Sequence, residues 1–205
     1  MTNFDKLVAY FEKFPGVGVR QAKRFAFHVL TMKTEQVNEF IRLVSSLPAT
    51  VTECVSCHRF FSTNIGVSRT CNICEDENRD QTKILIVASD NDIQAIERSG
   101  VYNGLYFILG GTVPLMSKDN DQKLRSGALK VLVSEKIKTD VLEVILGFAV
   151  NPDGDNTSRF IESILSEFSA TEKIRISHLG RGLSTGSELE YADPETIKSA
   201  LRNRI

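Results

Sequence analysis

The chain has 205 residues, 41% of them hydrophobic and 25% charged, which is typical of a globular protein with one medium domain or two small ones. A formal net charge of −1 gives no overall attraction to nucleic acid, and the longest apolar run, Val141 to Val150, is too short to cross a membrane and contains Glu143. No secretory signal is visible at the start of the chain, so we expect a cytoplasmic protein with no membrane partner.

Residues 1–50 are predicted to be helical and to form a DNA-binding region. Apolar side chains recur at helical spacing from Leu7 to Phe14, in a second helix from about Arg20 to Met32, and in a third stretch from about Glu35 to Leu47. Pro48 is expected to close the third helix. These residues carry seven Lys or Arg against four Asp or Glu, a local excess of three positive charges.

A glycine turn, Pro15-Gly16-Val17-Gly18, separates the first two helices. It allows exposed backbone N–H groups, and the N-terminus of the second helix adds partial positive charge, which together can bind a DNA phosphate. Basic side chains in the first turns of that helix can neutralise neighbouring phosphates, as in a helix-hairpin-helix element. The predicted DNA-binding residues are Gly16, Gly18, Arg20, Lys23 and Arg24. The alternative is a structural turn between packed helices, beside a solvated basic face.

The four cysteines of the chain form one constellation within residues 51–80. They occur as Cys54-x₂-Cys57 and Cys71-x₂-Cys74, with thirteen residues between the pairs. Two such turns can aim four thiolates at one point, which is the geometry of a closed, structural Zn²⁺ site. We therefore predict a small four-cysteine zinc finger that holds one ion per chain.

Other uses of the cysteines stay open at this point. Two disulfides would need an oxidising compartment, and a redox-active pair would normally occur once, at the start of a helix. The run Cys54-Val55-Ser56-Cys57-His58 also matches a haem-attachment motif, although the second cysteine pair argues against haem. Four thiolates can hold iron as well as zinc. His58 is expected to face solvent rather than to replace a thiolate.

Residues 81–180, which follow a polar linker from Glu75 to Gln81, alternate apolar strands with helices. The predicted strands are Ile84–Val87, Tyr106–Leu109, Val144–Leu146 and Ile174–Ile176, and the predicted helices are Asp92–Ser99, Asp121–Lys136 and Thr157–Phe168. This order predicts an α/β fold whose mostly parallel sheet is flanked by helices. Residues 181–205 form a C-terminal tail and helix, in which Asp193 caps a helix from Thr196 to Arg204 and Pro194 takes its first position.

The parts together resemble one family, the RecR bacterial recombination mediator proteins, over nearly the whole chain. The segments that carry the resemblance are Phe14-Pro15-Gly16-Val17-Gly18 followed by Ala22, Arg24, Ala26 and Phe27, then Ala95–Gly100, Tyr106–Gly111 and Gly182–Asp193. The resemblance implies a helix-hairpin-helix, a zinc finger, a Toprim-type α/β domain and a tail.

The same resemblance implies a function without enzymatic activity. Such a protein would form a homo-oligomeric ring, a dimer to tetramer, that clamps DNA during recombinational repair. It would act with RecO, and in some bacteria with RecF, to load RecA recombinase onto gapped or single-stranded DNA coated by single-strand-binding protein.

Two departures from the Toprim pattern concern its acids. Toprim enzymes place a Glu at the end of the first strand, where this chain has Ala88-Ser89, and an Asp-x-Asp later for Mg²⁺. Asp153 and Asp155 retain that spacing, but acids beside a helix N-terminus are favoured without any metal. The family's RecO contacts are attributed to this shortened acidic region, so affinity for RecO is also in question. The other acids of these loops, Asp90, Asp92 and Asp119 to Asp121, are expected to be solvated.

The leading hypothesis is a DNA-binding recombination mediator that reads DNA structure rather than base sequence. One alternative is a Mg²⁺-dependent Toprim nuclease that uses Asp153 and Asp155, against which Ala88 argues because no acid remains to pair with them. A second alternative is a zinc-stabilised adaptor that binds only proteins. Salt-dependent DNA binding would distinguish the mediator from the adaptor.

Overall fold

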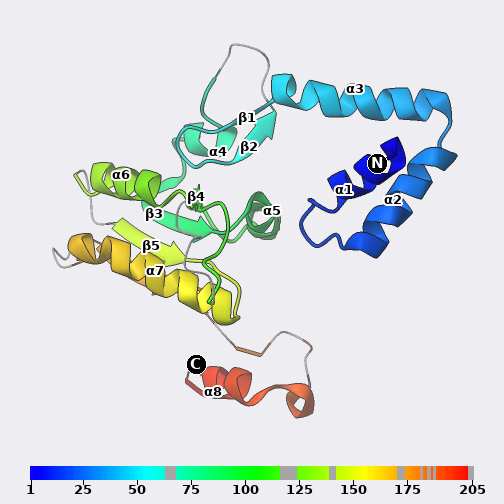
Figure 1. Ribbon diagram of the computed structural model, residues 1–205. Coiled ribbons are helices and arrows are strands. Elements are labelled where there is room, and N and C mark those ends of the chain that lie inside the picture. The colour runs from blue at the N-terminus through cyan, green and yellow to red at the C-terminus, as the bar shows by residue number, and fades with distance from the viewer. Residues whose placement is uncertain are drawn as a thin grey trace. The chain divides into compact units, whose positions relative to one another are not determined.

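The computed structural model describes residues 1–62, 68–115, 124–138, 142–169, 174–180, 182–183, 186 and 188–202. The chain divides into two compact units, one made of residues 1–52 and 62–66 and the other of residues 53–61 and 67–205 (Figure 1). None of the helices in the described part of the chain combines the length and the apolar content needed to cross a bilayer.

The first unit contains the helices α1 (Asn3–Phe11), α2 (Val19–Thr31) and α3 (Thr34–Thr50). Thr2 starts α1 with a capping box, since its hydroxyl accepts from the Asp5 amide while the Asp5 carboxylate accepts from the Thr2 amide. A small core joins α1 to α2 and consists of Val8, Phe11, Ala22 and Ala26. The two buried alanines allow the helices to approach closely, so the turn between them is held from both sides.

The third helix, α3, ends later than the sequence predicted. It continues through Pro48 to Thr50, so the expectation that Pro48 closes it was wrong. Proline lacks the backbone donor that would bind the Val44 carbonyl, and the helix continues in spite of this loss. Nearby hydroxyl groups bind other carbonyl groups of the same turns. Ser46 Oγ donates to the Leu43 carbonyl at 2.9 Å, and Thr50 Oγ1 donates to the Ser46 carbonyl at 3.0 Å.

The second unit is built on a four-stranded sheet in which every pair of neighbours is parallel. Its strands, in the order β4-β3-β5-β6, are Gly104–Ile108, Asp80–Val87, Leu142–Leu146 and Ile174–His178. Three helices follow strands, namely α5 (Asp90–Ser99), α6 (Ser126–Lys136) and α7 (Pro152–Ser169). The predicted α/β class with a parallel sheet is therefore confirmed.

Alternate residues of the central strands enter two different cores. On one face, Ile84 and Ile86 of β3 pack with residues of α6 and α7. On the other face, Leu85 and Val87 pack with Ile93 of α5 and with three of the four cysteines. Successive side chains of a strand point to opposite faces, so the four-cysteine segment forms part of the second layer over the sheet.

Several element boundaries differ from the predictions for local reasons. Strand β3 begins at Asp80, so the end of the expected linker belongs to the sheet. Helix α7 begins at Pro152, five residues before the predicted Thr157, because the Asn151 side chain accepts from the Gly154 amide at 2.8 Å. Helix α6 begins at Ser126, and the residues before 124 that were assigned to it lie outside the described residues.

The C-terminal segment forms a short 3₁₀ helix, Leu189–Tyr191, and the helix α8, Pro194–Arg202. The predicted N-cap is confirmed, since Asp193 Oδ1 accepts from the Thr196 amide at 3.0 Å. The last residues of the predicted helix, 203 and 204, lie outside the described part of the chain.

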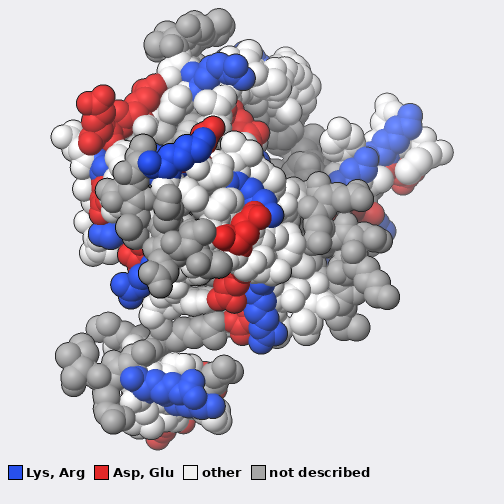
Figure 2. All heavy atoms as spheres, turned by 90° about the vertical axis from the view of Figure 1, so that its left-hand side faces the viewer, with Lys and Arg blue, Asp and Glu red and all other residues white. Residues whose placement is uncertain are grey.

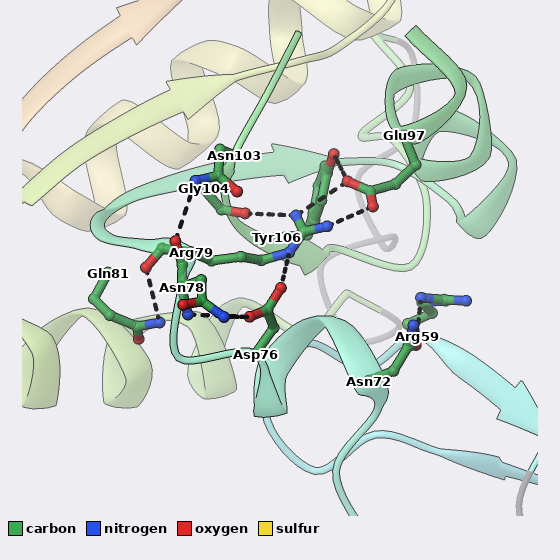
Figure 3. Close-up of polar contacts among 10 residues, drawn as sticks. All are labelled: Arg59, Asn72, Asp76, Asn78, Arg79, Gln81, Glu97, Asn103, Gly104 and Tyr106. Atoms are coloured by element: carbon green, nitrogen blue, oxygen red, sulfur yellow. Dashed lines mark hydrogen bonds and ion pairs between the residues drawn. The ribbon is translucent and has the colours of Figure 1, made fainter. Parts of the chain in front are cut away.

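Arg79 joins the segment after the cysteines to the edge of the sheet (Figure 3). Its guanidinium binds both carboxylate oxygens of Glu97 on α5, at 3.1 and 2.5 Å, and donates to the Gly104 carbonyl at 3.1 Å. The Tyr106 hydroxyl donates to the same carboxylate at 2.6 Å. Burial alone would raise the pKa of Glu97, but these two donors lower it below its ordinary value. Burial, together with the Glu97 carboxylate, raises the pKa of Tyr106 and keeps its hydroxyl protonated.

This ion pair predicts a loss of stability in acid. The pKa of Glu97 in the folded protein lies below its ordinary value of 4.5. The contribution of the Glu97 carboxylate to stability is therefore complete above pH 4.5 and is lost as the pH falls through the folded pKa. Glu97→Gln should lower the free energy of unfolding at neutral pH by about 1–3 kcal/mol. The variant should also lose less of that free energy when the pH is lowered. Urea unfolding at a series of pH values measures both effects. Glu135→Gln, an exposed residue of α6, is the control, and identical behaviour of the two variants would contradict the prediction.

Candidate metal centre and nucleic-acid interface

The structure brings the four cysteine sulfur atoms together at one point. All four Sγ atoms lie within 4.8 Å of one another, and those of Cys57 and Cys71 are 3.6 Å apart. Thiolates at about 2.3 Å from a tetrahedral zinc ion lie roughly 3.8 Å from each other, so the spacing fits one small ion. Cys54, Cys57 and Cys71 are buried and Cys74 is half-buried. The geometry describes a closed site without an approach for substrate.

Two tight turns place these sulfur atoms. The first pair lies between β1 (Val51–Glu53) and β2 (Phe60–Ser62), where the Cys54 amide donates to the Arg59 carbonyl at 2.8 Å. The second pair opens the short helix α4 (Asn72–Glu75), with Cys71 as its N-cap residue. The Cys71 amide donates to Cys54 Sγ at 3.4 Å, which links the two turns and favours a thiolate at Cys54.

Four thiol groups this close together are suited to binding a cation. Hydrogen bonds within the cluster, first with Cys57, lower the pKa of Cys54, and the same contact raises the pKa of Cys57. Four thiolates this close would repel one another, so full deprotonation needs a positive ion among them. Convergence of all four on one point does not suit two separate disulfides, and the burial of Cys54 and Cys57 does not suit haem attachment.

The cluster is fastened to the sheet by backbone and side-chain bonds. The Ile108 amide, at the end of β4, donates to the Cys57 carbonyl at 2.9 Å. The Phe60 amide donates to Asp90 Oδ1, at the start of α5, at 2.8 Å. Asp90 is therefore a structural acceptor rather than the solvated acid that was predicted. Asp92 also has a partner, because its carboxylate accepts from the Ser89 amide at 2.8 Å.

His58 does not face solvent, which corrects the sequence-based expectation. Its Nδ1 lies 2.7 Å from Glu53 Oε1. Its ring packs against that of Phe107 in a T-shaped arrangement, with the ring centroids 5.2 Å apart. Arg125 Nε lies 3.1 Å from the same Glu53 oxygen. The backbone at His58 is left-handed, with φ of 63°. Glu53 and His58 are five residues apart, but Phe107 and Arg125 join them only through the folded sheet, so the group was missed.

The turn between α1 and α2 has the features that anion binding requires. Gly16 adopts a left-handed conformation, with φ of 75°, which a residue with a side chain rarely adopts. Gly18 is the N-cap residue of α2 and has no side chain to bond the first amides of the helix. Those amides point out of the helix N-terminus, where the helix dipole is positive.

The basic residues predicted to bind DNA are exposed on α2. Arg20, Lys23 and Arg24 lie within its first two turns, and the helix contains no Asp or Glu. Arg24 Nη1 contacts Gln21 Oε1 at 3.4 Å, which leaves its other donors available. By contrast, Figure 2 shows Lys and Arg interspersed with Asp and Glu on the face of the second unit that it displays. In that unit, Lys130 Nζ pairs with Glu167 Oε1 at 3.0 Å. The helix α2 thus carries positive charge and no acid of its own, and Asp5 of α1 is a nearby acid that interacts electrostatically with Lys23.

The acidic pair Asp153 and Asp155 lies inside the first turn of α7 rather than in a loop before it. Asp153 Oδ1 accepts from the Leu115 amide at 3.0 Å, while Thr157 Oγ1 accepts from the Val113 amide at 2.8 Å. Residues two apart on a helix do not share a face, so the pair is poorly arranged to hold one ion. The contacts instead fix the segment that follows β4.

Among the described residues, the four cysteines are the one group of three or more His, Cys, Asp or Glu side chains close enough together to hold a metal ion. Ala88 follows β3 at the carboxyl edge of the sheet, where its carbonyl accepts from the Gly110 amide at 3.2 Å. The predicted acids at 119–121 lie outside the residues that the structure describes. Ala88 therefore supplies no carboxylate at this end of β3.

Comparison with known proteins adds evidence from the whole chain. Residues 4–47 match the family profile described as RecR, helix-hairpin-helix, and residues 182–205 match the profile described as RecR, C-terminal. The recombination protein RecR of Streptococcus thermophilus is 35% identical over 203 residues, which cover 99% of this chain and 96% of that protein. The proteins of the same name from Streptococcus sanguinis and Streptococcus uberis are 34% and 33% identical over the same coverage.

The metal centre predicts a specific result for a ligand substitution. We expect elemental analysis to find zinc in the parent protein and to find it lost in Cys71→Ser. Binding energy of order 10 kcal/mol is typical of such structural sites, so this variant should unfold at a much lower temperature. Ser56→Ala, which changes the same turn without touching a ligand, should retain both zinc and stability. Iron in the parent protein, or a folded parent without metal, would show the assignment to be wrong.

Proposed function

The chain belongs to the RecR family of recombination proteins, and from that membership we propose that it is a recombination mediator that binds DNA through the α1–α2 turn. The observation that carries the proposal is the N-terminus of α2. It has no side-chain cap, begins after two glycines and is followed by three exposed cations without a single acid on the helix. This arrangement suits a phosphate backbone and has little means of distinguishing one base pair from another.

The proposed contact combines two kinds of donor. The first amides of α2, after Gly18, would donate to one phosphate, while Arg20 and Arg24 would neutralise its neighbours. Lys23 lies on the same turns of the helix and would add a third charge. Gly16 serves this contact indirectly, because its left-handed backbone lets the chain turn sharply between the two helices.

We propose zinc as the ion at the four cysteines, with a structural role. The four-sulfur donor set and the closed, buried site support zinc over metals that prefer oxygen ligands. When bound, the ion would neutralise the thiolates and join the two turns. It would thereby keep the cysteine segment packed against β3 and α5.

We also propose that the protein is not an enzyme. The relatives are named as recombination proteins, and Ala88 stands where a Toprim enzyme needs an acid. Asp153 is committed to the Leu115 amide, which disfavours the alternative of a Mg²⁺-dependent nuclease. Family membership supports action with RecO, and in some bacteria RecF, in loading RecA onto gapped or single-stranded DNA in the cytoplasm.

Self-association is a further part of the proposal, and α3 offers a surface for it. The helix buries none of its residues in the structure. A stripe of large apolar side chains is about half exposed along it and comprises Phe40, Ile41, Leu43, Val44 and Leu47. Covering such a stripe with the same stripe of a second copy would remove it from water. Several α1–α2 turns on one oligomer would then bind one DNA molecule, which raises the effective concentration of each turn.

The DNA contact is tested by removing two of its charges. Because every subunit of an oligomer loses both, Arg20→Ala/Arg24→Ala should weaken binding to gapped DNA by about 10²-fold or more. The dependence of affinity on salt should become shallower at the same time. Fluorescence anisotropy across a salt series measures both quantities.

Lys6→Ala/Arg42→Ala is the matched control for this experiment, since it removes the same charge from exposed positions of the same unit. It should bind nearly as tightly as the parent. Equal affinities and equal salt slopes for the two double variants would mean that the α1–α2 turn is only structural.

The oligomer is tested on the α3 stripe. The parent protein should have a mass in solution that is a multiple of the 22.8 kDa chain. Phe40→Ser/Leu47→Ser should shift that mass towards the single chain, because it replaces two exposed apolar contacts with polar groups. Val131→Ser, at an exposed position on α6, should leave the mass unchanged. Sedimentation equilibrium decides the matter, and a parent protein of single-chain mass would contradict self-association.

A further inference from the structure

The outer surface of α2 contains a shallow hollow next to the basic residues. Its volume is about 540 Å³, and it is lined by Gln21, Arg24, Phe25, Phe27, His28 and Thr31. Arg24 belongs both to this hollow and to the predicted phosphate contact, so the two surfaces are continuous. A strand whose phosphate contacts Arg24 would therefore pass beside the hollow.

Two aromatic rings in the hollow are fixed but only partly covered. Phe27 packs against Phe4 of α1 with the ring centroids 4.8 Å apart, yet it remains 57% exposed. Phe25 packs against Phe11 at 5.7 Å and remains 36% exposed. Contacts with α1 thus hold the rings in place while apolar surface stays open to solvent. A ring that is already ordered loses little conformational entropy when a second flat group stacks on it.

The rest of the lining is polar and carries no negative charge. Arg24 supplies a planar cation, His28 supplies a second flat ring, and Gln21 and Thr31 supply hydrogen-bonding groups. Flat, π-rich ligands with an adjacent anion match this combination of apolar surface, cation and hydrogen-bond donors. Unstacked nucleobases attached to a phosphate backbone are ligands of that kind.

We propose that this hollow binds an unpaired base of single-stranded DNA by stacking, an inference that rests on the proposed DNA contact of α2. In a duplex, both faces of each base are covered by its neighbours, so only the phosphate contact is available. A single strand can turn a base out of its stack and use both contacts. Every base has a π-face, so the hollow confers preference for single-stranded DNA without preference for sequence.

A second copy of this chain is the competing occupant of an exposed apolar surface. The stripe on α3 suits that role better, because it presents five large apolar side chains between residues 40 and 47. The hollow on α2 mixes aromatic rings with Arg24 and sits on a helix that bears three positive charges and no negative one. Two copies joined through this helix would place like charges together, which DNA would not.

The experiment uses the full-length protein and three fluorescent DNA ligands of equal phosphate number. They are a thymidine single strand that contains one 2-aminopurine, an abasic single strand and a duplex. The variant is Phe27→Leu, which keeps an apolar contact to Phe4 but removes the aromatic face. Leu30→Ala is the matched control, because Leu30 is an exposed apolar residue of α2 that does not line the hollow.

We expect the parent protein to bind the thymidine strand more tightly than the abasic strand and to quench the 2-aminopurine fluorescence. Phe27→Leu should lose about fivefold or more in affinity for the thymidine strand together with the quenching, while its affinity for the abasic strand and the duplex stays the same. Leu30→Ala should behave as the parent on all three ligands.

Two results would overturn the inference. The first is equal binding of thymidine and abasic strands by the parent protein, which leaves the phosphate contact intact and removes the base contact. The second is a change of oligomeric mass in Phe27→Leu, which would assign the hollow to contact between copies. Failure of the proposed function itself looks different, because Arg20→Ala/Arg24→Ala would then bind all three ligands as the parent does.

Discussion

A parallel sheet must be covered on both faces, and in this protein the four-cysteine segment provides much of the cover on one of them. Leu85, Val87, Tyr106 and Ile108 point to that face, and among the described residues they pack against Ile93 of α5 and the cysteines themselves. A segment this short cannot order itself by apolar burial. In the proposed metal-bound state, the ion held by the four sulfur atoms would order this segment and, through it, the cover of the sheet.

The proposed DNA contact is organised differently from the metal centre. The α1–α2 pair has its own core, built from Val8, Phe11, Ala22 and Ala26, and its turn is shaped by Gly16 and Gly18. No cysteine lies in that core. Loss of the proposed ion should therefore damage the packing of the cysteine segment on the sheet first, and the local shape of the turn much less. This separation lets substitutions in the two units be interpreted independently.

Much of the fold could be predicted from the sequence, because short runs of neighbouring residues specify its elements. The four strands of the sheet, the cysteine constellation and the Asp193 cap are each specified by neighbouring residues. The early start of α7 was not predicted, although Asn151 precedes it and Pro152 takes its first position, which are common signals of a helix start. By contrast, the ion pair of Arg79 with Glu97 joins residues 18 apart through the fold, and an amphipathic pattern cannot specify such a pair.

The candidate site could be predicted only in part, because some of its features depend on contacts between residues that are distant in the sequence. Glycine and arginine spacing predicted the phosphate contact, but the hollow on α2 depends on how Phe4 and Phe11 hold Phe27 and Phe25. Exposed aromatic residues in a helix look like core residues in the sequence. Only packing shows which part of each ring remains in contact with water.

Hydrogen exchange at individual amides, with and without gapped DNA, tests the central claim most directly. Binding of a phosphate at the N-terminus of α2 should slow exchange of the amides from Gly18 to Gln21, which have no acceptor within the helix. The amides of the cysteine segment should exchange at the same rate in both states. Unchanged exchange at the start of α2, in protein shown to be saturated with DNA, would contradict the account.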